Sequence, residues 1–180
     1  EERKAARKYI QDNKIERRGF PGREASERKN NVETNATKAE EIDAYAPVSY
    51  DTKAHLYDEK VLRTLYLRFP NADWYEELGD FYRTDVDVPA ELIVDGKVYP
   101  SVCVRFRGNS SYMMPAEKKS LNVTIDYDAK NQRLYGYKTL NLLNCHEDPS
   151  LMHEILYSRI CREYLPAPKA NFVKLVINGE

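Results

Sequence analysis

The sequence predicts an α+β domain with a mainly antiparallel sheet and a packed helix near residues 149–164. Three features support this fold class. Apolar residues alternate on both sides of Asp95-Gly96, a pair that suits the positive φ angles of a type I′ hairpin turn. A second alternating run lies at 121–125, and the clearest amphipathic helical pattern follows it towards the end of the chain.

Upstream of the hairpin, the sequence predicts one strand and one short helix. Residues 65–69 alternate apolar and polar side chains, as expected for a half-buried strand. Trp74, Leu78 and Phe81 then recur at helical spacing before Asp85, which predicts a short amphipathic helix.

The outgoing strand of the hairpin separates apolar from basic side chains. Its apolar residues occupy even-numbered positions: Val98, Val102, Val104 and Phe106. Arg105 and Arg107 fall between them. Because side chains alternate along a strand, both arginines should lie on the face opposite Val104 and Phe106.

Two more strands are predicted after the hairpin. A loop containing Pro115 leads into a strand that begins at Lys118-Lys119. A turn at 128–132 then separates this strand from a short one at 140–142.

The amphipathic helix follows these strands. Asp148 is the expected N-cap and Pro149 the first helical residue, and an apolar stripe from Leu151 to Tyr164 should pack against the sheet. A last strand, 172–177, runs into a further hairpin signal, Asn178-Gly179, just before the sequence stops. The interpretation is a fragment of a longer protein, truncated at its C-terminal end.

Composition divides the chain near residue 45. Residues 1–45 are dense in charges of both signs and poor in aliphatic side chains. They can bury little apolar surface, so burial does not offset the conformational entropy that folding would cost. We therefore expect a charged N-terminal segment or linker, with room for a short helix at its start, followed by a folded domain at 50–180.

The overall charge and the apolar pattern exclude several functional classes. The 28 Lys and Arg residues balance 29 Asp and Glu residues, which argues against a nucleic-acid binder. No apolar run approaches the roughly 20 residues that cross a bilayer, so no membrane span is expected. The three cysteines, Cys103, Cys145 and Cys161, lack a CxxC pair and are interpreted as small buried hydrophobes.

A candidate binding loop lies between two predicted strands. Small and hydroxyl residues at 107–111 would let backbone N–H groups approach a phosphate, and Lys118 and Lys119 would add positive charge. An ordinary surface turn with solvated basic side chains explains the same pattern, so both interpretations stay open. His146 and His153 lack the spacing of a metal pair, and no metal site is assigned.

Several motifs in a fixed order resemble the CotH spore-coat kinase family. They are a hairpin with DGK, then RFRGNSS, KKSL, LNLLN with DPSLM, and PAPKANFVKLVINGE, and they cover roughly residues 56–180. The resemblance implies that residues 50–180 are the N-terminal lobe of an atypical protein-kinase-like fold, and that the second lobe lies outside this chain.

The resemblance also assigns nucleotide-binding roles. A loop would cover the phosphates of ATP, a lysine would contact them, and a helical glutamate would pair with that lysine. By position, the loop is Arg107, Gly108, Asn109, Ser110 and Ser111, the lysine is Lys118, with Lys119 as the fallback if the register shifts by one, and the glutamate is Glu154. The catalytic and Mg²⁺-binding aspartates of the family would lie in the second lobe, so this chain alone should be inactive.

At the level of the whole protein, the resemblance implies an atypical kinase that uses Mg-ATP to phosphorylate Ser or Thr of coat or exported proteins. Its partners would be the nucleotide and a protein substrate, and its location would be secreted, envelope- or coat-associated. The alternative is a non-catalytic CotH-like scaffold module in an extracellular or coat assembly, because function resides in sites rather than folds.

Overall fold

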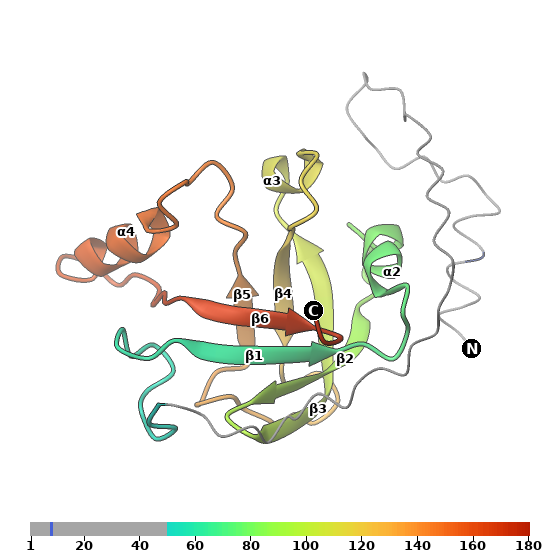
Figure 1. Ribbon diagram of the computed structural model, residues 1–180, viewed down its shortest axis with the longest axis horizontal. Helices are drawn as coiled ribbons and strands as arrows, with labels where there is room; N and C mark the ends of the chain where they lie inside the picture. Colours follow the sequence, from blue (N-terminus) through green and yellow to red (C-terminus); the bar gives the residue numbers. More distant parts are fainter. Residues whose placement is uncertain (1–7, 9–49) are drawn as a thin grey trace. The chain divides into compact units, whose positions relative to one another are not determined.

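The computed structural model describes Lys8 and residues 50–180 (Figure 1). Apart from Lys8, the expected charged segment 1–45 and its short helix lie outside the described residues. Residues 50–180 form the predicted α+β fold, built on one six-stranded sheet with the strand order β5-β4-β3-β2-β1-β6.

The elements follow one another along the chain in the order β1-α2-β2-β3-α3-β4-β5-α4-β6. The strands are β1 (Arg63–Arg68), β2 (Val88–Val94), β3 (Lys97–Arg107), β4 (Ser120–Thr124), β5 (Thr139–Leu142) and β6 (Val173–Ile177). The helices are α2 (Trp74–Asp80), α3 (Ser110–Met113) and α4 (His153–Cys161). Every strand predicted from alternation is present, and β4 begins at Ser120, two residues later than expected.

The sheet is mainly antiparallel, as predicted, with one parallel pair at its edge. β1 pairs with β2 in antiparallel register, whereas β6 returns beside β1 in parallel register. The Asn178 side chain fixes this return, since its Oδ1 accepts a hydrogen bond from the Phe69 N–H at 2.7 Å. The turn that follows has positive φ at both Asn178 and Gly179, 49° and 100°.

The β2–β3 hairpin forms at Asp95-Gly96, with φ of 53° and 74°. The even-numbered apolar pattern of β3 does not hold along its whole length, because the register shifts opposite Ala90 to Leu92 and Ser101 takes a φ of 53°. As a result Tyr99 is buried, while Val98 is 37% exposed. Beyond this bulge, Arg105 and Arg107 lie opposite the core face as expected.

The core lies between the sheet and α2. Its most buried apolar side chains are Leu65, Leu67, Leu92, Val102, Val104, Val123 and Ile125. Leu78 and Phe81 from the α2 region close it, and each such side chain contributes about 1.5–3 kcal/mol by leaving water. Cys103 is buried as predicted, but Cys145 and Cys161 are only partly buried.

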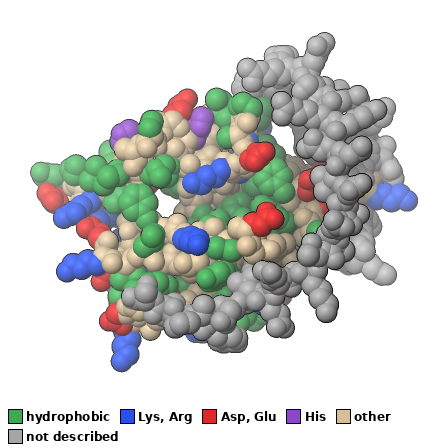
Figure 2. All heavy atoms as spheres, viewed as in Figure 1, with side chains coloured by type: hydrophobic (Ala, Val, Ile, Leu, Met, Phe, Trp, Pro, Cys, Tyr) green, Lys and Arg blue, Asp and Glu red, His purple; other side chains and the backbone are tan. Residues whose placement is uncertain are grey.

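The predicted helix at 149–164 is shorter than expected and does not pack as expected. Leu151 has a φ of 60°, which is incompatible with a helix that starts at Pro149, so α4 begins at His153. Its N-cap is Met152 and not the predicted Asp148, which still reaches the helix start because its Oδ2 accepts the His153 N–H at 2.8 Å. The apolar stripe faces outward, with Ile160 57% exposed, and Figure 2 shows hydrophobic side chains gathered over this helix.

Candidate functional site

The predicted loop lies between the end of β3 and the start of β4. The backbone leaves β3 at Arg107, turns at Gly108 and Asn109, and forms the single helical turn α3. Arg107 pairs with Ser120 across the two strands, so Lys118 and Lys119 run back alongside the turn. The structure therefore brings residues 107–111 and both lysines to the same end of the sheet.

Gly108 gives the turn its shape. Its φ is 92°, a conformation that residues with a side chain rarely adopt. A Cβ at this position would also clash with Oγ of Ser111. A residue other than glycine would therefore strain the backbone here and require the Ser111 hydroxyl to move.

Tyrosines near α2 hold the loop from the outside. The Tyr82 hydroxyl donates a hydrogen bond to the Gly108 carbonyl at 2.6 Å, and its ring stacks on Tyr112 with 3.5 Å between centroids. The Tyr75 hydroxyl donates to the Glu117 carbonyl at 2.9 Å. These side chains pre-organise the loop, yet no local motif identifies them, because they become neighbours only when α2 folds onto β3.

The two lysines have different environments. The Lys119 ammonium donates to the carbonyls of Tyr112 and Met114 at 2.8 and 2.6 Å, and burial lowers the pKa of its side chain. The Lys118 side chain is exposed and forms no hydrogen bond or ion pair within the described part of the chain. Lys119 thus anchors the loop, while Lys118 is available to a ligand.

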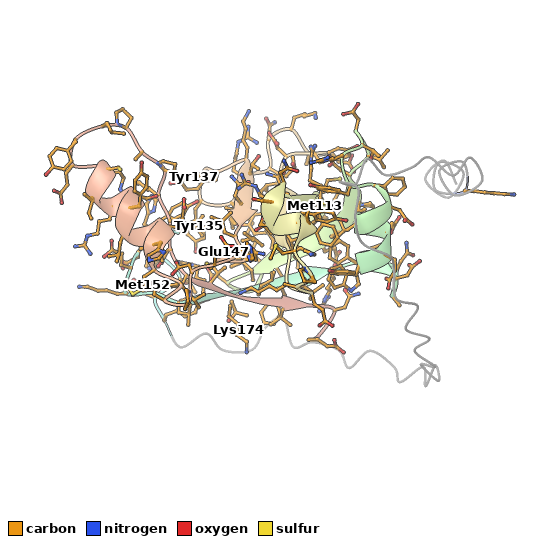
Figure 3. All side chains as sticks on the ribbon, turned by 90° about the horizontal axis from the view of Figure 1, so that it is seen from above. Met113, Tyr135, Tyr137, Glu147, Met152 and Lys174 are labelled. Carbon is orange, nitrogen blue, oxygen red and sulfur yellow. The ribbon has the colours of Figure 1, made fainter. Side chains whose placement is uncertain are left out.

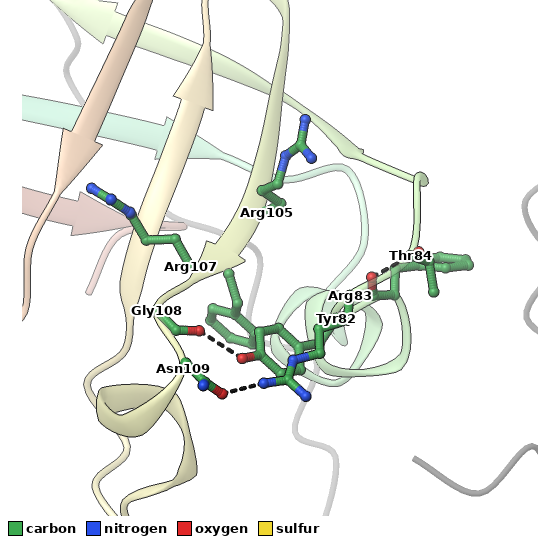
Figure 4. Close-up of a pocket in the computed structure, with 9 residues that line it drawn as sticks. Tyr82, Arg83, Thr84, Arg105, Arg107, Gly108 and Asn109 are labelled. Atoms are coloured by element: carbon green, nitrogen blue, oxygen red, sulfur yellow. Dashed lines mark hydrogen bonds between the residues drawn. The ribbon is translucent and has the colours of Figure 1, made fainter. Parts of the chain in front are cut away.

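A shallow pocket of about 240 Å³ opens beside the loop (Figure 4). Residues 81–84 form one wall and residues 105–109 the other, so Arg83, Arg105 and Arg107 are among the lining residues. The Arg83 guanidinium turns towards Asn109, whereas that of Arg107 points away from both (Figure 4). Nε of Arg105 lies 2.8 Å from Oδ1 of Asp87, a buried atom without a hydrogen bond in the described residues. Burial raises the pKa of Asp87, and Arg105 opposes that rise.

Arg83 is a pocket residue that the sequence does not reveal. Its backbone has a φ of 62° just after α2, and its guanidinium donates a hydrogen bond to Oδ1 of Asn109 (Figure 4). The same group lies 5.4 Å from the centroid of the Tyr82 ring. Its role depends on the approach of residues 81–84 to the loop. This is a tertiary contact that the spacing of residues along the chain does not predict.

Glu154 lies apart from this cluster. It is an exposed residue in the first turn of α4, and it forms no ion pair with Lys118 or Lys119. α4 and α3 are well separated in both views of the ribbon (Figures 1 and 3). The structure therefore groups the loop with the two lysines and leaves Glu154 outside.

The histidines and acids of the described region form no metal centre. No three His, Cys, Asp or Glu side chains among residues 50–180 lie close enough to hold an ion together. His146 instead lies 3.6 Å from Glu147, and His153 lies 3.3 Å from Asp148. Within the same residues, no helix has the length and apolar character of a membrane span.

Comparison with known proteins finds a similarity in the part of the chain that contains the loop. Residues 104–180 match a family model described as CotH kinase protein. No curated protein matches the chain. The matched stretch begins within β3 and includes residues 107–111, both lysines and α4. The expected resemblance is thus confirmed there: residues 104–180 are similar to the CotH kinase family.

Proposed function

We propose that residues 50–180 are the nucleotide-binding N-terminal lobe of a CotH-like atypical kinase. The observation that carries this proposal is the tight loop after β3, fixed by Gly108 and Tyr82, beside a group of basic side chains. Such a loop can approach a phosphate closely, because no side chain at its turn blocks the backbone.

Charge around the loop favours an anionic ligand. Arg107 and Lys118 have no carboxylate partner among the described residues, whereas Arg105 pairs with Asp87. A guanidinium binds phosphate oxygens with two parallel hydrogen bonds, and an ammonium binds them as a point charge. In this proposal Arg107 and Lys118 bind the phosphates of ATP, and Lys119 positions the loop.

Mg²⁺ would accompany the nucleotide, with its ligands supplied outside residues 50–180. Phosphoryl transfer needs metal ligands and a group that positions the acceptor hydroxyl in addition to a phosphate clamp. We therefore propose that the intact protein transfers phosphate to Ser or Thr of a coat or exported protein, and that it resides in the coat, the envelope or outside the cell.

Transfer of labelled phosphate from Mg-ATP by the intact protein tests this proposal. Lys118→Met should abolish most transfer, because it removes a phosphate contact without touching a structural bond. The matched control is Lys130→Met, an exposed lysine in the turn at the opposite end of β4. Lys119→Met should reduce both transfer and thermal stability, because Lys119 holds the loop in the folded protein.

Two results would reject the kinase role. Equal transfer by wild type and Lys118→Met would show that Lys118 does not contact the phosphates. Absence of both transfer and ATP binding in the wild type would instead favour a non-catalytic scaffold module.

A further inference from the structure

We propose that Arg83 is a further phosphate ligand of this pocket and binds the nucleotide's phosphate chain beside the loop at 107–111. Arg83 precedes the stretch 104–180 that matches the CotH family. This inference rests on the proposed function, because it names the group that completes the same phosphate site from the opposite wall.

The fold directs Arg83 at the loop. Residues 81–84 follow α2 and face residues 105–109 across the pocket. A φ of 62° at Arg83 is costly for a residue with a side chain, and such conformations persist where the surrounding structure holds them. Here the Arg83 guanidinium meets Asn109, the residue next to the tight turn at Gly108.

The partner of Arg83 is neutral and can be exchanged. Its hydrogen bond is to the side-chain amide of Asn109, and it has no carboxylate partner within the described residues. A phosphate oxygen is a stronger acceptor than an amide oxygen, because it carries negative charge and lets the guanidinium form an ion pair with two parallel hydrogen bonds. An incoming phosphate would therefore displace Asn109 from Arg83 without breaking an ion pair.

The charge balance of the pocket also favours binding of phosphate by Arg83. Arg83, Arg105 and Arg107 are among the residues that line a space of about 240 Å³, and Arg105 pairs with Asp87. The Arg83 guanidinium has no carboxylate partner within the described region. A phosphate chain bound against the loop would supply the negative charge that Arg83 lacks, and the Tyr82 ring supports the Arg83 guanidinium from one side.

Calorimetric titration of the whole chain with four probes separates phosphate binding from nucleoside binding. The probes are Mg-ATP, Mg-ADP, inorganic tripolyphosphate and adenosine. Arg83→Gly removes the guanidinium and relaxes the positive φ, so the fold should be kept, and thermal unfolding of the variant checks this. Arg83→Lys keeps the positive charge but loses the two parallel N–H donors of the guanidinium. Arg159→Gln is the control, because Arg159 is a distant exposed arginine of α4.

The expected result is an approximately tenfold loss of affinity for Mg-ATP and tripolyphosphate in Arg83→Gly, with a smaller loss in Arg83→Lys. Arg159→Gln should bind like the wild type, and binding of adenosine should not respond to any Arg83 variant.

The outcomes distinguish this inference from the proposed function. Unchanged Mg-ATP affinity in Arg83→Gly would overturn the role of Arg83 and leave the nucleotide site standing. Binding of tripolyphosphate but not of Mg-ATP, weakened by Arg83→Gly, would retain Arg83 as a phosphate ligand and reject the nucleotide. Failure of the wild type to bind any phosphate probe would overturn both.

Discussion

Gly108 shows how a single residue sets the geometry of the loop. It combines a positive φ with a Cβ position that meets the Ser111 hydroxyl, and its carbonyl accepts the hydrogen bond from Tyr82. Gly96 has a similar φ of 74°, but no atom lies within 4 Å of where its Cβ would be. An alanine at position 96 would therefore cost only the unfavourable backbone angle. An alanine at position 108 would cost the same angle and also distort the loop.

Gly108→Ala and Gly96→Ala are predicted to destabilise the folded protein to a similar extent but to differ in their affinity for Mg-ATP. Each should lower the free energy of unfolding by about 1–2 kcal/mol, because alanine disfavours the left-handed region. Gly108→Ala alone should also weaken Mg-ATP binding, since Ser111 must move. Thermal unfolding and calorimetry measure the two effects, and normal binding by Gly108→Ala would contradict the proposed role of the loop.

At the scale of elements, alternation and turn residues predicted the strands well. Residues 65–69 and the Asp95-Gly96 hairpin follow local rules, because the strand period and the I′ turn depend on neighbouring residues only. The bulge at Ser101 escaped prediction because Val98 continues the apolar period although Tyr99 takes the buried place. The loop residues were found from composition, whereas Arg83 required the packing of α2 on β3.

The start of α4 escaped prediction for a related reason. Cys145, Glu147 and Leu151 all have positive φ, from 51° to 62°, in a segment whose sequence resembles a helix start. Asp148 organises this segment, because its Oδ1 accepts hydrogen bonds from the N–H and hydroxyl of Ser150 and its Oδ2 accepts the His153 N–H. These hydrogen bonds belong to turns and not to a helix that begins at Pro149, so the helix starts four residues later than predicted.

Asp148→Ala is predicted to destabilise the protein, because the N–H groups of Ser150 and His153 lose their acceptor at the start of α4. The Ser150 hydroxyl holds the pKa of Asp148 below its usual value of 3.8. Its contribution is therefore present above pH 3.8 and is lost as the pH falls through the lowered pKa. The measurement is the free energy of unfolding from pH 2 to 7 for the wild type, Asp148→Ala and the exposed control Glu147→Ala. A difference between the wild type and Asp148→Ala that does not change with pH would contradict this prediction.

At the scale of the whole molecule, a buried ion pair joins segments that are distant in sequence. Nε of Arg63 lies 3.0 Å from Oδ2 of Asp95, and both side chains are almost fully buried. Hydroxyls of Tyr50 and Tyr135 donate to the same carboxylate, and Arg63 donates to the carbonyl of His55 at 3.1 Å. Because the charges are hydrogen-bonded as well as paired, the network stabilises one arrangement of the strands and turns.

Tyr50 makes this network sensitive to alkali. Burial, followed by the hydrogen bond to Asp95, raises the pKa of Tyr50 from 10.0 to about 12. The folded state then keeps a proton that the unfolded state loses, so this stabilisation is complete below pH 10 and is lost as the pH rises through 12.

Tyr50→Phe should lower the free energy of unfolding by about 1 kcal/mol at pH 7, through loss of one hydrogen bond. The difference between wild type and Tyr50→Phe should shrink between pH 10 and 12. Chemical unfolding at a series of alkaline pH values measures it. A difference that stays constant across this range would show that Tyr50 does not ionise differently in the folded protein.

The central claim is that the loop between β3 and β4 binds the phosphates of a nucleotide. Calorimetric titration of the whole chain with Mg-ATP tests it most directly, with Lys118→Met and Lys130→Met alongside. The account predicts saturable binding by the wild type and by Lys130→Met, and much weaker binding by Lys118→Met. No binding by the wild type, or equal binding by all three proteins, would contradict it.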